Sequence, residues 1–410
     1  MSFEAPRGTH DILPAEQPRW ERVTRAAEGL SAAFGYGRIT TPALEDTELF
    51  LRTSGQGSDI VEKEMYTFED RGRRSLTLRP EGTAPVCRAY LQHGLQRGPQ
   101  PFKAYMVAPM YRYDRPQKGR YREHWQWSVE AIGSSDPAVD AEVIALYAEL
   151  LRRLGVRRYW LELNSIGDRA CRPAYVQRLE AWLDEHRDEL GADVREKRAT
   201  SPLRVFDVKD ERTRAALAAA PKIGESLCDA CREHFAEVRH YLDAYGLEHR
   251  LVPTLVRGLD YYTRTTFEFV GEALGAKDVI CGGGRYDYLV EEIGGPPTPG
   301  IGFGAGIERL LLQLDEEGVE VARPAGIDVF FVRDDGAPRE EVLRVMAVLR
   351  RAGRGCETDY AGRSLKGQLT QASRLGAATI VIARADGATL RRRGETDVEL
   401  SYPELAEALR

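Results

Sequence analysis

Apolar residues recur at helical spacing in several stretches of the chain. The first stretch spans residues 16–34 and is followed by Gly35, a residue type that commonly ends a helix. Its apolar positions share one face of a helical repeat and are Trp20, Val23, Ala27, Leu30 and Phe34. The same periodicity predicts further helices at 139–154, 307–314, 339–352 and 365–375.

Short runs of β-branched and apolar residues predict strands. The first lies at 37–42, where Pro42 is compatible with a strand end. Between residues 76 and 128, strand-like segments are interrupted by prolines and by a polar, basic stretch at 114–123, which predicts an antiparallel sheet with loops. Further strands are predicted at 159–163, 251–256, 265–270, 278–281, 327–332, 356–360 and 378–383.

The order of these elements predicts two domains. A charge-rich, mostly helical segment at about 169–248, with one brief strand candidate at 203–206, interrupts the strands of the N-terminal half and is interpreted as an insertion. Residues 323–326, Arg-Pro-Ala-Gly, are typical of a linker, and strands and helices alternate after them. We therefore expect a first domain at 1–325 that contains the insertion, and a small α/β domain at 326–410.

Composition narrows the classes of function. The chain has 410 residues, of which 42% are hydrophobic and 30% charged, which is typical of a folded protein with sizeable cores. It contains no apolar run of about 18 residues, and its start lacks the pattern of a signal peptide, so membrane spanning and secretion are not expected. The six cysteines are scattered and fit reduced thiols, so we expect a cytoplasmic protein.

Positive charge is concentrated locally although the formal net charge is −6. Residues 111–122 hold five cationic side chains and three tyrosines, the strongest basic constellation in the chain. One interpretation is a strand-loop-strand hairpin whose loop contacts phosphates, because arginine matches phosphate oxygens and aromatic rings can stack on bases. The alternative is a solvated charged loop, which a charge run alone favours.

Three other segments carry candidate chemistry. The glycines at 302–306 lack the dinucleotide-binding spacing, but Glu308 and Arg309 follow them where a strand is expected to meet a helix. The polar cluster at 78–83 could cap a helix or present a carboxylate to a substrate amine. Three potential zinc ligands lie close together in sequence, namely Cys228, Cys231 and His234. A zinc site needs a fourth ligand and no second cluster at metal-like spacing follows, so packing is the favoured interpretation and no metal is assigned.

Taken together, these segments resemble the histidyl-tRNA synthetase family of class II aminoacyl-tRNA synthetases over almost the whole chain. Residues 35–42 resemble motif 1, residues 112–130 motif 2 and residues 302–309 motif 3. Two signatures specific to the histidine enzymes are sharper, namely Val-Arg-Gly-Leu-Asp-Tyr-Tyr-Thr at 256–263 and Cys-Gly-Gly-Gly-Arg-Tyr-Asp at 281–287.

The resemblance implies a role for each residue of one site. Histidine would be held by polar side chains: Glu81 and Thr83 at the amino group, Glu130, Tyr261 and Tyr262 at the imidazole, and Gln126 lining the same pocket. The catalytic guanidiniums would also bind ATP: Arg112 at the α-phosphate and the carboxylate, Arg257 at the α-phosphate during transfer, and Arg309 at the far phosphates. His124 would complete the ATP site, and Arg115 and Gln117 would meet the acceptor end of tRNA.

The implied reaction joins L-histidine to the histidine tRNA through a histidyl-adenylate, with ATP as substrate and phosphate-bound Mg²⁺. No general base is required, because fixed guanidiniums and magnesium stabilise the charge that builds up at phosphorus. The implied fold is α+β: the class II antiparallel sheet with flanking helices, a helical insertion, and a C-terminal α/β anticodon-binding domain. The resemblance also implies a homodimer with motif 1 at its interface.

Two departures from the family pattern leave alternatives open. Asp114 replaces the usual glutamate of motif 2, and His-Trp-Gln at 124–126 replaces Phe-His-Gln, so the ring that stacks on adenine is undecided. An alternative function is a catalytically inactive synthetase-like regulatory subunit of histidine biosynthesis. Such paralogues lack the C-terminal domain and have eroded signatures, whereas this chain keeps Arg257, Tyr261 and Tyr262.

Overall fold

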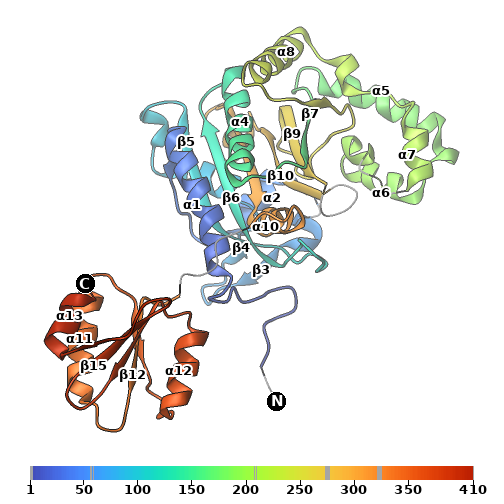
Figure 1. Cartoon of the computed structure of the whole chain (residues 1–410). Helices are drawn as coiled ribbons and strands as arrows, with labels where there is room; N and C mark the ends of the chain where they lie inside the picture. Colours follow the sequence, from blue (N-terminus) through green and yellow to red (C-terminus); the bar gives the residue numbers. More distant parts are fainter. Residues whose placement is uncertain are drawn as a thin grey trace. The chain divides into compact units, whose positions relative to one another are not determined.

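The computed structural model describes residues 3–55, 58, 60–206, 208, 210–272, 278–320 and 326–409. It divides the chain into two compact units, Met1–Ala322 and Arg323–Arg410 (Figure 1). The predicted linker at 323–326 lies outside the described residues except for Gly326.

The first unit is built on an eight-stranded sheet in the order β1-β5-β6-β11-β10-β9-β7-β8. The edge pairs β1 with β5 and β7 with β8 are parallel, and every pair between them is antiparallel. The strands are β1 (Gly37–Arg38), β5 (Phe102–Tyr111), β6 (Glu123–Ile132), β7 (Tyr159–Ser165), β8 (Arg250–Leu251), β9 (Thr263–Gly271), β10 (Asp278–Arg285) and β11 (Gly300–Gly306). The predicted strands at 37–42 and 251–256 therefore shrink to short edge strands.

Helices α1 (Gln17–Ala33), α4 (Pro137–Leu154), α8 (Asp229–Ala244) and α10 (Ile307–Glu316) contribute to one hydrophobic core with this sheet. Helices α1 and α4 lie side by side (Figure 1). Local sequence explains the bounds of α4: the Asp136 side chain accepts a hydrogen bond from the Ala138 amide, and Gly155 ends the helix at a φ of 86°. The predicted helices at 16–34, 139–154 and 307–314 are confirmed.

A second core joins helices α3 (Thr83–Gln92) and α9 (Leu289–Glu292) to the segment that separates β7 from β8. A small sheet in the order β2-β4-β3 and the short helix α2 (Thr47–Thr53) belong to the same unit. Its strands are β2 (Leu44–Asp46), β3 (Tyr66–Glu69) and β4 (Ser75–Leu78).

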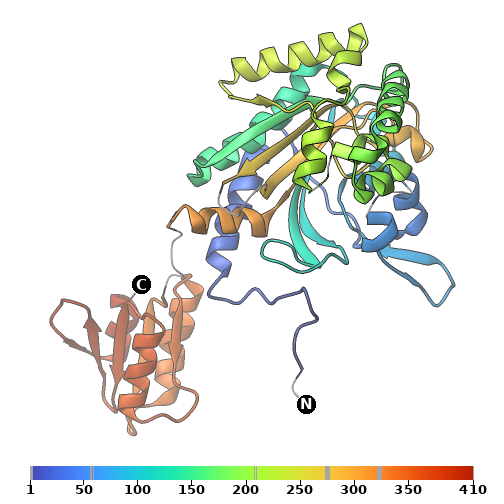
Figure 2. The ribbon, with the colours of Figure 1, turned by 90° about the vertical axis from the view of Figure 1, so that its right-hand side faces the viewer.

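The segment between β7 and β8 contains α5 (Arg172–Glu185), α6 (Ala192–Thr200) and α7 (Glu211–Leu217) before α8. The first three helices form a group of their own beside the sheet (Figure 1, Figure 2). The strand predicted at 203–206 is wrong, because Pro202–Phe206 forms a 3-10 helix. A short apolar run cannot distinguish strand from helix, and a leading proline suits the start of a helical turn.

The second unit is a five-stranded sheet in the order β13-β12-β14-β15-β16, parallel among the first three strands and antiparallel at β15 and β16. Helices α11 and α13 share one core with the sheet and α12 contributes to another. The elements are β12 (Val329–Arg333), α11 (Arg339–Arg351), β13 (Cys356–Thr358), α12 (Leu365–Arg374), β14 (Thr379–Ala383), β15 (Ala388–Arg392), β16 (Val398–Leu400) and α13 (Tyr402–Ala408). The last three were not predicted.

Candidate active site

A cleft of about 200 Å³ opens over strands β6, β10 and β11 of the large sheet. Its wall comes from the start of α3, the β5–β6 hairpin, the segment before β9 and the start of α10. Nine predicted site residues line it, namely Glu81, Thr83, Arg112, His124, Gln126, Arg257, Tyr261, Tyr262 and Arg309. Segments that are distant in sequence thus supply one site.

The basic stretch at 111–122 forms the predicted strand-loop-strand hairpin between β5 and β6. Arg112 Nε donates a hydrogen bond to the Pro80 carbonyl at 2.7 Å, which holds the guanidinium at the cleft. Arg120 and Tyr121 also line the cleft and were not predicted as site residues. Arg115 and Gln117 lie on the same loop but are not among the lining residues.

Arg257 and Arg309 both line the cleft and are held by different partners. Arg257 forms an ion pair with Glu268 of β9; burial opposes the charge, but this pairing keeps the pKa of Arg257 above its usual value. Arg309 donates to the Val279 carbonyl at 2.6 Å and to the Gly119 carbonyl at 2.9 Å. The second bond ties the start of α10 to the hairpin loop.

Glycines in β10 and β11 leave the space that the cleft side chains occupy. A Cβ on Gly282 would lie 2.4 Å from the Arg257 guanidinium, and one on Gly302 would lie 2.0 Å from a carboxylate oxygen of Glu130. The glycine run at 282–284 belongs to β10, which extends beyond the predicted strand end at residue 281. The absent side chain of Gly282 makes room for the Arg257 guanidinium.

Two buried carboxyl groups, those of Glu81 and Glu130, belong to this region. Glu81 accepts hydrogen bonds from the Thr83 and Ala84 amides at 2.7 and 2.9 Å, so it caps α3 and also lines the cleft. Glu130 lies behind the lining residues and accepts hydrogen bonds from the Thr83 hydroxyl at 2.8 Å and the Tyr286 hydroxyl at 2.6 Å. Glu81 can therefore cap the helix and also present its carboxyl group to a substrate amine, the two roles that the sequence left open.

Burial changes the protonation of this site. Desolvation raises the pKa of Glu130 to about 8, and it also raises the pKa of Glu81. Desolvation, with the charges of Arg112 and Arg309, lowers the pKa of His124 to about 3, so its imidazole is neutral at physiological pH. The cleft therefore combines a neutral ring, fixed guanidiniums and the poorly solvated carboxyl group of Glu81, and the carboxyl group of Glu130 lies behind its lining residues.

The remaining predicted groups have other partners. Tyr261 and Tyr262 pack with ring centroids 4.6 Å apart, and Tyr261 packs edge-on against Tyr286 at 6.1 Å. His234 does not join Cys228 and Cys231; its Nε2 atom lies 3.6 Å from a carboxylate oxygen of Asp140. The three potential zinc ligands named from the sequence therefore do not form one cluster.

The antiparallel sheet, the arginine-bearing hairpin above it and the arginine at the start of α10 are the features of a class II aminoacyl-tRNA synthetase. The profile of the histidyl-tRNA synthetase family matches residues 8–310. A histidine–tRNA ligase from Halothermothrix orenii is 47% identical over 416 residues, which cover 100% of this chain and 99% of that protein. The chain belongs to the histidyl-tRNA synthetase family.

Solved structures agree with this assignment. Apo histidyl-tRNA synthetase from S. aureus matches with a TM-score of 0.83 and 36% identity, covering 100% of both chains. A protein from Bacillus halodurans C, described as an ATP phosphoribosyltransferase regulatory subunit/histidyl-tRNA synthetase, matches with a TM-score of 0.66 over 94% of this chain and 99% of that one. At 23% identity that second likeness shows the fold alone.

These findings confirm the predicted fold class and the predicted activity, the ligation of histidine to tRNA with ATP. The alternative of an inactive regulatory subunit is not favoured, because full-length relatives near 47% identity are ligases. Among the described residues, no helix is both long and apolar enough to cross a membrane.

Proposed function

We propose that the cleft carries out both steps of histidine ligation. In the first step the carboxylate of histidine attacks the α-phosphorus of ATP in line, an oxygen–phosphorus bond forms, and pyrophosphate leaves. In the second step a ribose hydroxyl at the end of the tRNA attacks the carbonyl carbon of the histidyl-adenylate, and AMP leaves. The observation that carries this proposal is the convergence of Arg112, Arg257 and Arg309 on one cleft that also holds Glu81.

The three arginines would stabilise the charge that develops on phosphorus. Arg112 would contact the α-phosphate and the histidine carboxylate, Arg257 the α-phosphate during transfer, and Arg309 the far phosphates. Their backbone and ion-pair contacts support this proposal, because donors fixed before the reaction need no reorganisation when charge develops. The neutral His124 imidazole would stack on the adenine, where a charged ring would lose more hydration.

Recognition of histidine would use the polar side chains around Glu81 and Glu130. Glu81 and Thr83 would hold the amino group, with Gln126 lining the same pocket, and Glu130, Tyr261 and Tyr262 would meet the imidazole nitrogens. The burial of Glu130 and its hydrogen bonds to Thr83 and Tyr286 support this proposal, since a fixed polar group in a dry pocket discriminates strongly.

Glu130→Gln tests the recognition proposal. The change keeps the shape of the side chain but replaces one acceptor oxygen by an NH₂ group that can only donate, so kcat/KM for histidine should fall by about 10²-fold or more while ATP binding is retained. Glu149→Gln on α4 is a matched control, because Glu149 forms an exposed ion pair with Arg152. Normal histidine activation by Glu130→Gln would contradict the proposed pocket.

Phosphate-bound Mg²⁺ fits the same cleft. Glu308 lines it, one of its carboxylate oxygens accepts the Trp125 amide at 2.8 Å, and the other is buried without a hydrogen-bond partner among the described residues. Carboxylate oxygens are the protein ligands that Mg²⁺ prefers. Glu308, with Asp114 of the hairpin loop, would hold the ion, which would supply charge neutralisation at the phosphates.

The tRNA would contact both units of the chain. Arg115 and Gln117 would meet the acceptor end, which their position on the hairpin loop beside the cleft supports. The second unit would bind the anticodon, which the exposed Tyr360 ring beside the Arg339 guanidinium supports, because an aromatic ring next to a cation can stack on a base. Residues 326–410 would then act as a separate RNA-binding domain.

The enzyme would function as a cytoplasmic homodimer. Residues 35–42 would lie at the interface, and the position of β1 at the edge of the large sheet supports this, because Gly37 and Arg38 are exposed. Light scattering of the intact chain tests the proposal; a monomer at micromolar concentration would contradict it.

A further inference from the structure

A second cluster of reactive side chains lies where the helical segment between β7 and β8 begins and ends. Asp168 and Cys171 follow β7 directly, and Cys228 and Cys231 lie at the start of α8. One oxygen and three sulfur atoms from these residues all lie within 4.8 Å of one another. The two pairs are far apart in sequence, so the fold itself assembles this cluster.

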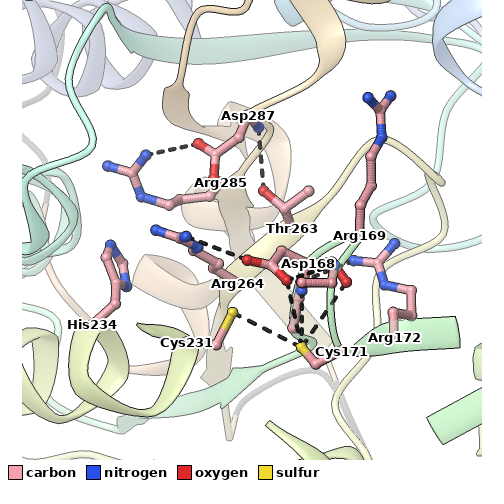
Figure 3. Close-up of polar contacts among 12 residues, drawn as sticks. Asp168, Arg169, Cys171, Arg172, Cys231, His234, Thr263, Arg264, Arg285 and Asp287 are labelled. Carbon is pink, nitrogen blue, oxygen red and sulfur yellow. Dashed lines mark hydrogen bonds and ion pairs between the residues drawn. The ribbon is translucent and has the colours of Figure 1, made fainter. Parts of the chain in front are cut away.

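The separations match those of ligands around one small cation. Cys171 Sγ lies 3.9 Å from Cys231 Sγ and 3.6 Å from a carboxylate oxygen of Asp168 (Figure 3). A tetrahedral zinc ion with zinc–sulfur bonds of about 2.3 Å holds its sulfurs about 3.8 Å apart. A disulfide would require a sulfur–sulfur distance of about 2.05 Å, so these two thiols are separate groups.

The surrounding chain is shaped around these side chains. Gly167 has a φ of 63°, and a Cβ there would lie 2.6 Å from Cys171 Sγ, so glycine leaves room for the thiol. Arg264 donates a hydrogen bond to the second carboxylate oxygen of Asp168 at 3.3 Å. Its backbone adopts a φ of 47°, a strained conformation for arginine. A hydrogen-bonded carboxylate is the usual arrangement behind a metal ligand.

The cluster is enclosed by protein. Cys171, Cys231 and Asp168 are buried, with exposed fractions of 5%, 0% and 7%. Cys228, the N-cap of α8, is partly buried, and Cys231 lies in the first turn of that helix. Three thiols and a carboxylate thus lie together, largely shielded from solvent.

We propose that Asp168, Cys171, Cys228 and Cys231 bind Zn²⁺ in a closed, structural site. Three sulfur ligands select a soft or borderline metal, and four protein ligands would fill a tetrahedral site without leaving a position for substrate. The ion would join the two ends of the helical segment to the sheet. Arg172, next to Cys171, donates to the Tyr262 carbonyl at 2.7 Å, so the site would also brace the segment that enters the cleft.

This proposal departs from the sequence-based expectation of no metal. The other two ligands, Asp168 and Cys171, precede Cys228 and Cys231 in the chain. His234 is not among the four proposed ligands. Figure 3 shows Cys171, Cys231 and Asp168 turned toward one another, with His234 apart from them.

Metal analysis of the intact chain tests the proposal. Protein purified without chelator from zinc-supplemented cells should contain about one equivalent of zinc. Cys171→Ser and Cys231→Ser should lower the bound zinc by about tenfold or more. The matched control is Cys356→Ser, which replaces a buried cysteine of the other unit and should leave the zinc content unchanged.

Cobalt substitution tests the coordination geometry in the wild-type protein, without using variants that lose the metal because they fail to fold. Co²⁺ in the wild-type site should show the intense visible bands of tetrahedral coordination, and Asp168→Cys should strengthen the thiolate charge-transfer band by adding a fourth sulfur. Wild-type protein that binds neither metal would overturn the proposal. Zinc retained by Cys231→Ser would do the same, as would a Cys171–Cys231 disulfide that leaves fewer than six titratable thiols.

Discussion

Replacing Arg257 with alanine is expected to slow histidine activation far more than it weakens histidine binding. A guanidinium about 4 Å from a phosphoryl oxygen contributes about 4 kcal/mol at an effective dielectric constant of about 20. ATP already carries negative charge at the α-phosphate, so only the increase of that charge between the bound substrate and the transition state affects turnover. Removal of one such fixed group costs about 2.7–4 kcal/mol, which corresponds to about 10²–10³-fold in kcat.

The ion pair with Glu268 must be considered in this experiment. Arg257→Ala leaves the Glu268 carboxylate, only 14% exposed, without this partner, which should cost about 1–3 kcal/mol of folding free energy. Glu268→Gln alone keeps the guanidinium and tests whether the fold tolerates loss of the pair. Arg257→Ala combined with Glu268→Gln removes the guanidinium together with the carboxylate charge that it neutralises.

Histidine-dependent exchange of pyrophosphate into ATP is the assay, with thermal unfolding measured on each variant. We expect kcat to fall by about 10²-fold or more in both variants that lack Arg257, while KM for histidine changes by less than about threefold. Turnover within about tenfold of wild type in a folded Arg257→Ala protein would refute the assigned role.

Two further predictions concern pH and domain function. The pKa of Glu130 is raised from 4.5 to about 8, so between these values the folded chain binds more protons than the unfolded chain, and stability should fall as pH rises through this window. The loss should be smaller in Glu130→Gln by thermal unfolding, and identical profiles would contradict the raised pKa. A chain ending near residue 325 should keep much of its pyrophosphate exchange but need a far higher tRNA concentration for aminoacylation, since phosphate contacts dominate RNA affinity; circular dichroism and sizing would first establish that it folds. If it does, unchanged aminoacylation efficiency would remove the anticodon-binding role from the second unit.

Long periodic segments could be predicted closely from sequence. Helices α1 and α4 lie within about two residues of their predicted bounds, because each presents a continuous apolar face and ends at a glycine or its neighbour. The missed strand β16 is a three-residue edge strand with exposed Val398 and Glu399, and its neighbour β15 ends in two arginines, of which Arg391 is exposed. Their apolar runs are too short to indicate strands from sequence.

The site was predicted by resemblance more than by pattern. Spacing alone did not distinguish the basic hairpin from a solvated loop, and the glycine run in β10 gave no sign that it makes room for Arg257. Arg120 and Tyr121 were missed because the direction of a loop side chain depends on tertiary contacts. Asp168 and Cys171 were missed because their partners Cys228 and Cys231 are close only in the folded chain.

The central claim is that this one cleft activates histidine and rejects other amino acids. Pyrophosphate exchange by the intact wild-type chain, measured with each amino acid in turn, tests it most directly. The account predicts exchange with L-histidine, and rejection by about 10⁴-fold in kcat/KM of an amino acid such as phenylalanine, whose ring leaves the buried polar groups unpaired. Exchange that proceeds equally well with phenylalanine, or that is absent with histidine, would contradict the account.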